Sequence, residues 1–152
     1  MLVKLYEPHP EILKAEHIYG LLKMYFKTID KVDRDKEHFF VFHVDTRNKL
    51  KIMELVSVGV LNNTVVHPRE VFTRAVGKRS ASIFIAHNHP SGSIEPSADD
   101  VNVTNKLCEA GYILSIPVLD HIIYTADGFY SFKQNGLMWS LAVGGYSYSR
   151  LF

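Results

Sequence analysis

The stretch IFIAHNHPSGSIEPSADD, residues 83–100, places two histidines directly after an apolar run and follows them with a Pro/Ser/Gly loop that ends in acidic residues. The run over residues 81–86 is short, continuous and apolar, which is typical of a strand covered on both faces. His87 and His89 lie at the carboxyl end of this predicted strand. Because extended residues two apart point the same way, both imidazoles can reach one cation.

The loop after the histidines can return a third metal ligand. Ser97, followed three residues later by Asp100, has the spacing of a helix cap, so a helix is predicted to begin there. A carboxylate in the first turn of that helix can face the histidines. Two histidines and one carboxylate, with a fourth position open to water, are the ligand set of a catalytic zinc site. A plainer interpretation stays open, because a Ser and an acid at this spacing are most often only a helix cap.

The rest of the chain predicts an α/β fold, with one mixed β-sheet flanked by helices. Apolar residues at helical spacing predict a helix within residues 10–29. Pro68 begins a second helix that stops near Gly77, and Ser97 begins a third that ends at Gly111. Predicted strands cover residues 38–45, 49–61 and 81–86 and two runs on either side of a turn at 126–128.

Glu54 interrupts an apolar face in one of these strands. Side chains alternate along a strand, so one face is predicted to carry Leu50, Ile52, Glu54, Val56, Val58 and Val60. Burying an ionised carboxylate without a partner is costly, so Glu54 should be protonated, lie at a strand edge, or meet a cation or bound water. A metal-dependent hydrolase needs a general base that is not itself a ligand, and Glu54 is the candidate.

Composition bounds the class of protein. The 152 residues carry 17 basic and 16 acidic side chains, and a formal charge of +1 argues against non-specific nucleic-acid binding. The single cysteine, Cys108, cannot form an internal disulfide, which fits a reducing compartment. No segment reaches about 18 consecutive apolar residues, and the first residues lack the apolar core of a signal peptide. We therefore expect one globular, soluble, cytoplasmic protein that does not associate with membranes.

The spacing of the polar residues resembles a known motif. His87, one residue, His89, seven residues, Ser97, two residues and Asp100 match the JAMM motif of MPN-domain metalloproteins, with Glu54 in the position of the upstream glutamate. The stretches GVLNNTVVHPREVF, HNHPSGSIEPSADD and LDHIIYTADGFYSF resemble the RadC-like branch. The resemblance implies an MPN fold similar to cytidine deaminases, zinc bound by both histidines and Asp100, acid/base chemistry by Glu54, and oxyanion stabilisation by Ser97.

The resemblance also implies a division of the chain. An N-terminal helical segment covers residues 1–37, an MPN/JAMM catalytic domain covers 38–136, and a C-terminal extension of unknown role covers 137–152. Longer RadC-like proteins carry an N-terminal region that resembles a helix-hairpin-helix DNA-binding module. Only about 37 residues precede the domain here, so a link to DNA is weakened.

The predicted site and the resemblance are compatible with two functions. The first is a zinc-dependent hydrolase of JAMM type that cleaves an amide or isopeptide bond in a peptide substrate with metal-activated water. The alternative is a zinc-holding accessory or binding module related to DNA repair, without catalysis. The near-zero net charge disfavours direct nucleic-acid binding in either case. His121 is expected to form a hydrogen bond within the sheet, and Cys108 to be a buried packing residue.

Overall fold

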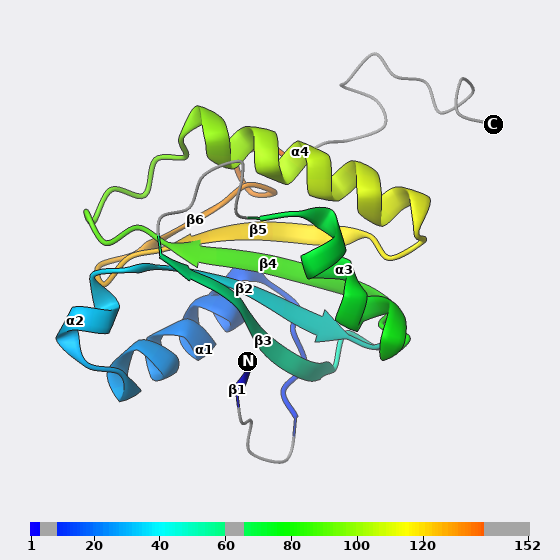
Figure 1. Cartoon of the computed structure of the whole chain (residues 1–152), viewed down its shortest axis with the longest axis horizontal. Helices are drawn as coiled ribbons and strands as arrows, with labels where there is room; N and C mark the ends of the chain where they lie inside the picture. The colour runs from blue at the N-terminus through cyan, green and yellow to red at the C-terminus, as the bar shows by residue number, and fades with distance from the viewer. Residues whose placement is uncertain (4–8, 60–65, 139–152) are drawn as a thin grey trace.

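The computed structural model describes residues 1–3, 9–59 and 66–138, and these residues form a six-stranded mixed sheet with helices on both faces (Figure 1). The strand order is β1–β3–β2–β4–β5–β6. In chain order the elements are β1 (Leu2–Val3), α1 (Ala15–Thr28), α2 (Lys31–Arg34), β2 (Glu37–Val44), β3 (Leu50–Gly59), α3 (Pro68–Gly77), β4 (Ser82–Asn88), α4 (Ala98–Ile113), β5 (Val118–Tyr124) and β6 (Phe129–Ser131). The predicted α/β fold with a mixed sheet is confirmed. No helix in this part of the chain is both long and apolar enough to cross a membrane.

Most of the predicted elements form. The helix predicted within residues 10–29 is α1, and the two hairpins are the antiparallel pairs β2–β3 and β5–β6. β4 and β5 are parallel, and α4 is the crossover helix between them. Two elements were not predicted: β1, which pairs with β3 at the sheet edge, and the short helix α2. Residues 139–152, most of the predicted C-terminal extension, lie outside the described residues.

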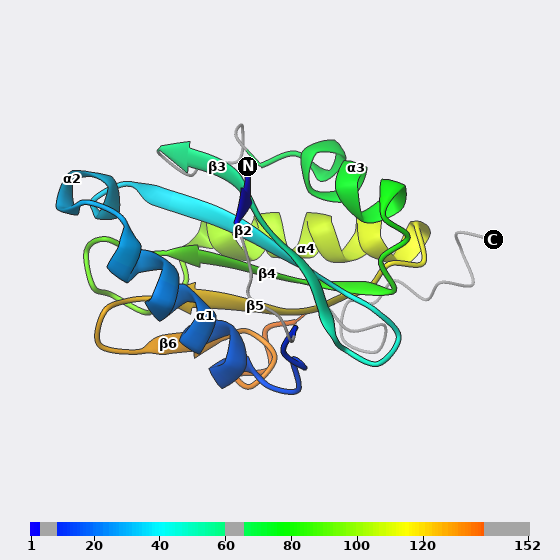
Figure 2. The ribbon, with the colours of Figure 1, turned by 90° about the horizontal axis from the view of Figure 1, so that it is seen from below.

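Each face of the sheet carries its own apolar core. Figure 2 shows α1 in front of the sheet and α4 behind it. Under α1, Ile18 and Leu22 pack with Phe40 of β2. On the opposite face, Phe72 of α3 and Leu107 of α4 pack with other residues of β2 and β4. Because α1 shares a core with the sheet, the N-terminal helix belongs to the same folded unit.

The residues of β3 face differently from the prediction. The register between β2 and β3 shifts at two places, and such irregularities change which side chains face which side of a sheet. Leu50 therefore packs in the core under α1, whereas Val56 packs against the core under α3 and α4. The prediction that alternate residues from Leu50 onward share one face was wrong. Val60, the last of that row, lies outside the described residues.

Gly111 lies inside α4 rather than after its last turn. The helix continues to Ile113 and is capped by Leu114. A Cβ at Gly111 would lie 2.6 Å from the backbone oxygen of Ile116 and 3.0 Å from Cζ of Phe72. The glycine is therefore required by the close approach of α4 to α3 and to the chain that leads into β5, and not by a helix stop.

A pair of substitutions tests this packing. Gly111→Ala should lower the free energy of unfolding by about 1–3 kcal/mol, because the added methyl group overpacks the contact. Gly20→Ala is the matched control, since a Cβ at Gly20 of α1 meets nothing within 4 Å. That control should raise stability by about 0.5–1 kcal/mol through helix propensity. Urea unfolding measures both, and a Gly111→Ala variant as stable as wild type would contradict the close contact.

Candidate metal centre

β4 holds the first of the predicted ligands at a buried position in the middle of the sheet. β4 pairs with β2 on one side and β5 on the other, so His87 lies opposite Phe39 and is only 1% exposed. Asn88 ties the strand end to β2, because its side-chain oxygen accepts a β2 backbone N–H at 2.6 Å. The N–H of His89 donates to the carbonyl of Tyr124 at 2.9 Å. Both histidines are thus held by backbone contacts with neighbouring strands.

The cap of α4 positions the third ligand. The hydroxyl of Ser97 accepts the Asp100 N–H at 3.1 Å, and Oδ2 of Asp100 accepts the Ser97 N–H at 2.9 Å. This reciprocal pair is the predicted capping box, and it is confirmed. Because the cap uses Oδ2 of Asp100 as an acceptor, it also fixes the direction of the carboxylate. The helix cap and the candidate ligand are therefore the same group.

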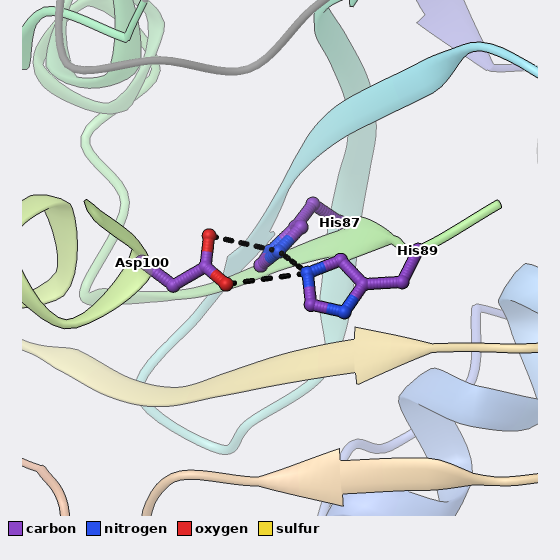
Figure 3. Close-up of side chains that lie close together, drawn as sticks. All are labelled: His87, His89 and Asp100. Atoms are coloured by element: carbon purple, nitrogen blue, oxygen red, sulfur yellow. Dashed lines mark hydrogen bonds and ion pairs between the residues drawn. The ribbon is translucent and has the colours of Figure 1, made fainter. Parts of the chain in front are cut away.

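The three side chains converge on one point (Figure 3). One ligand atom from each of His87, His89 and Asp100 lies within 4.8 Å of the others. The two Nε2 atoms are 3.0 Å apart, and each lies 3.2 Å from an oxygen of Asp100. Two imidazole nitrogens and a carboxylate oxygen are the donors that a three-ligand zinc site uses. The donor set and its convergence therefore fit a divalent metal ion.

The protonation of the cluster also fits a metal site. Nδ1 of His89 lies 2.7 Å from the Ser93 carbonyl, which can only accept, so Nδ1 carries the proton and Nε2 faces Asp100. Burial acts to raise the pKa of Asp100, but the neighbouring rings of His87 and His89 hold it well below its ordinary value. Burial acts to lower the pKa of His89, but Asp100 and the Ser93 carbonyl raise it above the ordinary value. A metal ion would replace the proton that His89 and Asp100 share.

The cluster opens onto a cleft of about 710 Å³. His89 and Asp100 line this cleft together with Ser97. The Ser97 hydroxyl accepts the Asp100 N–H, so its own proton remains available to donate. Ser97 thus lies beside the cluster with a hydroxyl proton free to donate. A group that stabilises an oxyanion needs both of these properties.

Glu54 has other partners. The residue is only 8% exposed. Oε2 lies 2.9 Å from Nε2 of His43, and Oε1 lies 2.9 Å from Nε of Arg74 in α3. Of the outcomes expected for a carboxylate among apolar residues, Glu54 thus meets a cation, the guanidinium of Arg74. Glu54 lines a separate cavity with Arg74 and Lys78. The described residues that line the cleft at His89 do not include Glu54.

The strand register explains this separation. Glu54 lies opposite Val41 of β2, and Val41 lies opposite Ile85 of β4, two residues before His87. Strands are about 4.8 Å apart with about 3.3 Å per residue, so two strand steps and two residues put the Cα atoms of Glu54 and His87 about 12 Å apart. This placement does not support the predicted role of Glu54 as the base at the cluster.

Glu37 is a further carboxylate of the cleft at the cluster, and the spacing of the motif did not reveal it. Glu37 is the first residue of β2, is half-buried, and lines the same cleft as His89, Ser97 and Asp100. In the antiparallel pair of β2 and β4, Phe39 lies opposite His87. Continuing this register by two residues puts Glu37 opposite His89. Side chains two apart in a strand share a face, so Glu37 could have been predicted to lie on the same face as Phe39. The charged residues before Glu37 instead indicated a solvated connection.

His121 was predicted to hydrogen bond within the sheet, and its ring does so with a candidate metal ligand. Nε2 of His121 lies 2.8 Å from Nδ1 of His87. Nδ1 of His121 lies 2.6 Å from the hydroxyl of Thr104 in α4. Burial and the neighbouring His87 lower the pKa of His121 well below its ordinary value. His121 and Thr104 are therefore further residues of the site.

A mixed sheet with helices on both faces and a His-x-His and Asp cluster at its centre has the character of a JAB/MPN-type domain. A family model described as a RadC-like JAB domain matches residues 12–137, and the chain belongs to this family. The resemblance to the RadC-like branch is thereby confirmed. The match begins before α1, in keeping with the packing of that helix into the shared core.

Curated proteins from several organisms are similar to this chain. The UPF0758 protein of Chlorobium chlorochromatii is 45% identical over 106 residues, which are 70% of this chain and 48% of that protein. The UPF0758 protein of Rubrobacter xylanophilus is 41% identical over 129 residues, 85% of this chain and 54% of that protein. The UPF0758 protein of Methanosarcina mazei is 42% identical over 132 residues, 87% of this chain and 56% of that protein. The chain spans about half the length of the curated relatives it matches.

Zinc titration tests whether Asp100 is a ligand. Asp100→Asn keeps an oxygen for the Ser97 N–H but loses the negative charge, so zinc affinity should fall by more than the ~10–100-fold typical of losing an outer partner. Asp99→Asn is the matched control, because Asp99 lines the same cleft without belonging to the cluster. Competition with a chromophoric chelator measures both affinities. Equal loss in the two variants would show that general charge, and not ligation by Asp100, governs binding.

Proposed function

We propose that this domain is a zinc-dependent hydrolase that cleaves an amide or isopeptide bond. The observation that carries the proposal is the convergence of two histidine Nε2 atoms and one carboxylate at the edge of a cleft. His87, His89 and Asp100 would hold the zinc ion. When bound there, zinc would polarise a substrate carbonyl and acidify a water molecule at the open coordination position.

Glu37 takes the role of general base that we first gave to Glu54. A general base must lie within reach of the attacking water without being a ligand itself. The position of Glu37 supports this role, because it lines the cleft with His89 and acts electrostatically on that ring. In the proposed reaction Glu37 accepts the proton of the attacking water and then returns it to the leaving amine.

Ser97 stabilises the negative charge that develops on the carbonyl oxygen. Its hydroxyl oxygen is occupied by the N–H of Asp100, which leaves the hydroxyl proton for the cleft. Donors fixed in advance at the position of an oxyanion are among the largest contributions to catalysis. The position of Ser97 at the helix cap supplies that fixed geometry.

The charge of the cleft supports a peptide substrate. Five carboxylates and one lysine line it: Asp35, Glu37, Glu95, Asp99, Asp100 and Lys36. Phosphates are repelled by such a surface, whereas amines and basic side chains are attracted. The cleft therefore favours a peptide substrate that carries basic side chains near the cleaved bond. It gives no support to nucleic-acid binding at this face, the alternative related to DNA repair.

A comparison of two glutamines tests the proposal. Zinc-loaded protein is assayed against panels of peptide, isopeptide and nucleic-acid substrates. On any substrate that is cleaved, Glu37→Gln should lower kcat by about 10²–10⁴-fold, because general base catalysis contributes that much, while zinc content stays unchanged. Glu54→Gln should keep kcat and instead lower stability, because it weakens a buried pair with Arg74.

The opposite pattern would overturn the assignment. If Glu54→Gln lost turnover at full zinc content while Glu37→Gln kept it, Glu37 would not be the base. His89→Ala should lose both zinc and turnover, which separates loss of metal from loss of proton transfer. If zinc-loaded wild-type protein cleaved none of the substrates, the hydrolase proposal would fail as a whole.

A further inference from the structure

We propose that Thr104 and His121 are positioning residues that keep the proton of His87 on Nδ1, so that its Nε2 lone pair faces the metal site. The inference rests on the proposed metal site, because it explains how one of the ligands is oriented. It concerns residues that do not touch the metal themselves. Neither Thr104 nor His121 is part of the JAMM spacing that led to the ligands.

A continuous chain of hydrogen bonds joins two of the ligands through the protein interior. Thr104 Oγ1 donates to the Asp100 carbonyl at 2.6 Å. The same hydroxyl lies 2.6 Å from Nδ1 of His121, and Nε2 of His121 lies 2.8 Å from Nδ1 of His87. Thr104 is 0% exposed and both histidines are 1% exposed, so water does not compete for these contacts.

The direction of each hydrogen bond in this series follows from its last acceptor, the backbone carbonyl of Asp100. A backbone carbonyl can only accept, so the single proton of the Thr104 hydroxyl is given to Asp100. The hydroxyl must then accept from His121, which puts a proton on Nδ1 of that ring. A neutral His121 with its proton on Nδ1 offers Nε2 as an acceptor. His87 must therefore donate from Nδ1. Its Nε2 is left with a lone pair, which faces Nε2 of His89 at 3.0 Å and can accept a proton donated by that ring.

The surroundings of His121 favour the neutral ring. Its two hydrogen-bond partners, Thr104 and His87, carry no negative charge. Phe132 stacks on the ring at 4.6 Å between centroids, and Phe39 lies at 6.0 Å. A second proton on His121 would be a buried charge without a paired carboxylate, which is costly. It would also make His87 accept at Nδ1 and turn Nε2 into a donor, which cannot bind a metal.

The fold explains why these residues meet. In the parallel pair β4–β5, His121 lies opposite Ile85 and Ile123 opposite His87, so the two histidines share one face of the sheet. Thr104 follows Asp100 by four residues in α4, one turn along the helix, and so lies on the same helix face. The orientation of His87 is therefore coupled to the position of α4, which also carries Asp100.

Nuclear magnetic resonance of the metal-free protein reads the tautomer directly. Two-bond ¹⁵N–¹H correlation at pH 8 should show His87 of the wild type with its proton on Nδ1. Thr104→Val removes the hydroxyl with little change of shape and should populate the tautomer with the proton on Nε2. Thr104→Ser restores the hydroxyl and should restore the wild-type tautomer. A wild-type His87 with its proton on Nε2 would overturn the inference even if no variant folded.

Zinc affinity supplies the second measurement. Thr104→Val should bind zinc about 10–100-fold more weakly than wild type, as is typical when the partner of a ligating histidine is removed. Thr104→Ser should bind within a few-fold of wild type. A merely structural role would lower the melting temperature of Thr104→Val and leave the tautomer and the zinc affinity of the folded protein unchanged, and that result would overturn the inference.

The outcomes for this inference and for the hydrolase proposal are distinguishable. A tautomer shift in Thr104→Val without cleavage of any substrate by wild type would support the positioning role and overturn the hydrolase. Cleavage by wild type with an unchanged tautomer and unchanged zinc affinity in Thr104→Val would support the hydrolase and overturn the positioning role.

Discussion

β2 and β4 pair antiparallel in the middle of the sheet, with Phe39 opposite His87. This one strand pairing sets the positions of both the histidine ligands and the proposed base, Glu37. The pairing buries His87 between two strands, which limits the directions its ring can take. The same register, continued by two residues, brings Glu37 at the start of β2 toward His89, which directly follows β4. A shift of β4 by one residue relative to β2 would turn His87 to the opposite face, under α1, and away from Glu37. The cluster therefore depends on a backbone register that is fixed by apolar residues along both strands.

The electrostatics of the site balance within a small volume. Asp100 is held as an anion by two imidazoles and by the cap of α4, and His89 is held toward its charged form by the same carboxylate. A half-buried carboxylate is tolerated here because the Ser97 N–H and the His89 ring both donate to it. A divalent ion supplies the same compensation with stronger charge. The arrangement that stabilises the metal-free protein is thus the one that a metal would use.

Part of the site could be predicted from the sequence because it is built from local rules. Strand alternation relates His87 to His89, and a helix cap relates Ser97 to Asp100; both rules act within one stretch of chain. The choice between Glu54 and Glu37 is not local. It depends on the strand order, which puts β3 and Glu54 two strands away from His87 of β4, and on Arg74, which reaches Glu54 from α3.

The same distinction holds for the fold and for the outer residues of the site. The α/β fold and most helices and strands could be predicted from periodicity, but the role of Gly111 depends on Phe72 and Ile116, which lie elsewhere in the chain. His121 meets His87 only because β4 and β5 are parallel neighbours. Period-two alternation identifies which residues share a face of one strand, and it carries no information about which strand lies next to it.

X-ray absorption at the zinc edge, on wild-type protein loaded with one equivalent of zinc, tests the central claim most directly. The account predicts two imidazole nitrogens at about 2.0–2.1 Å from zinc. The remaining ligands should be carboxylate and solvent oxygens at about 2.0–2.2 Å from zinc. Coordination by fewer than two imidazoles, or a protein that retains no zinc after gel filtration, would contradict it.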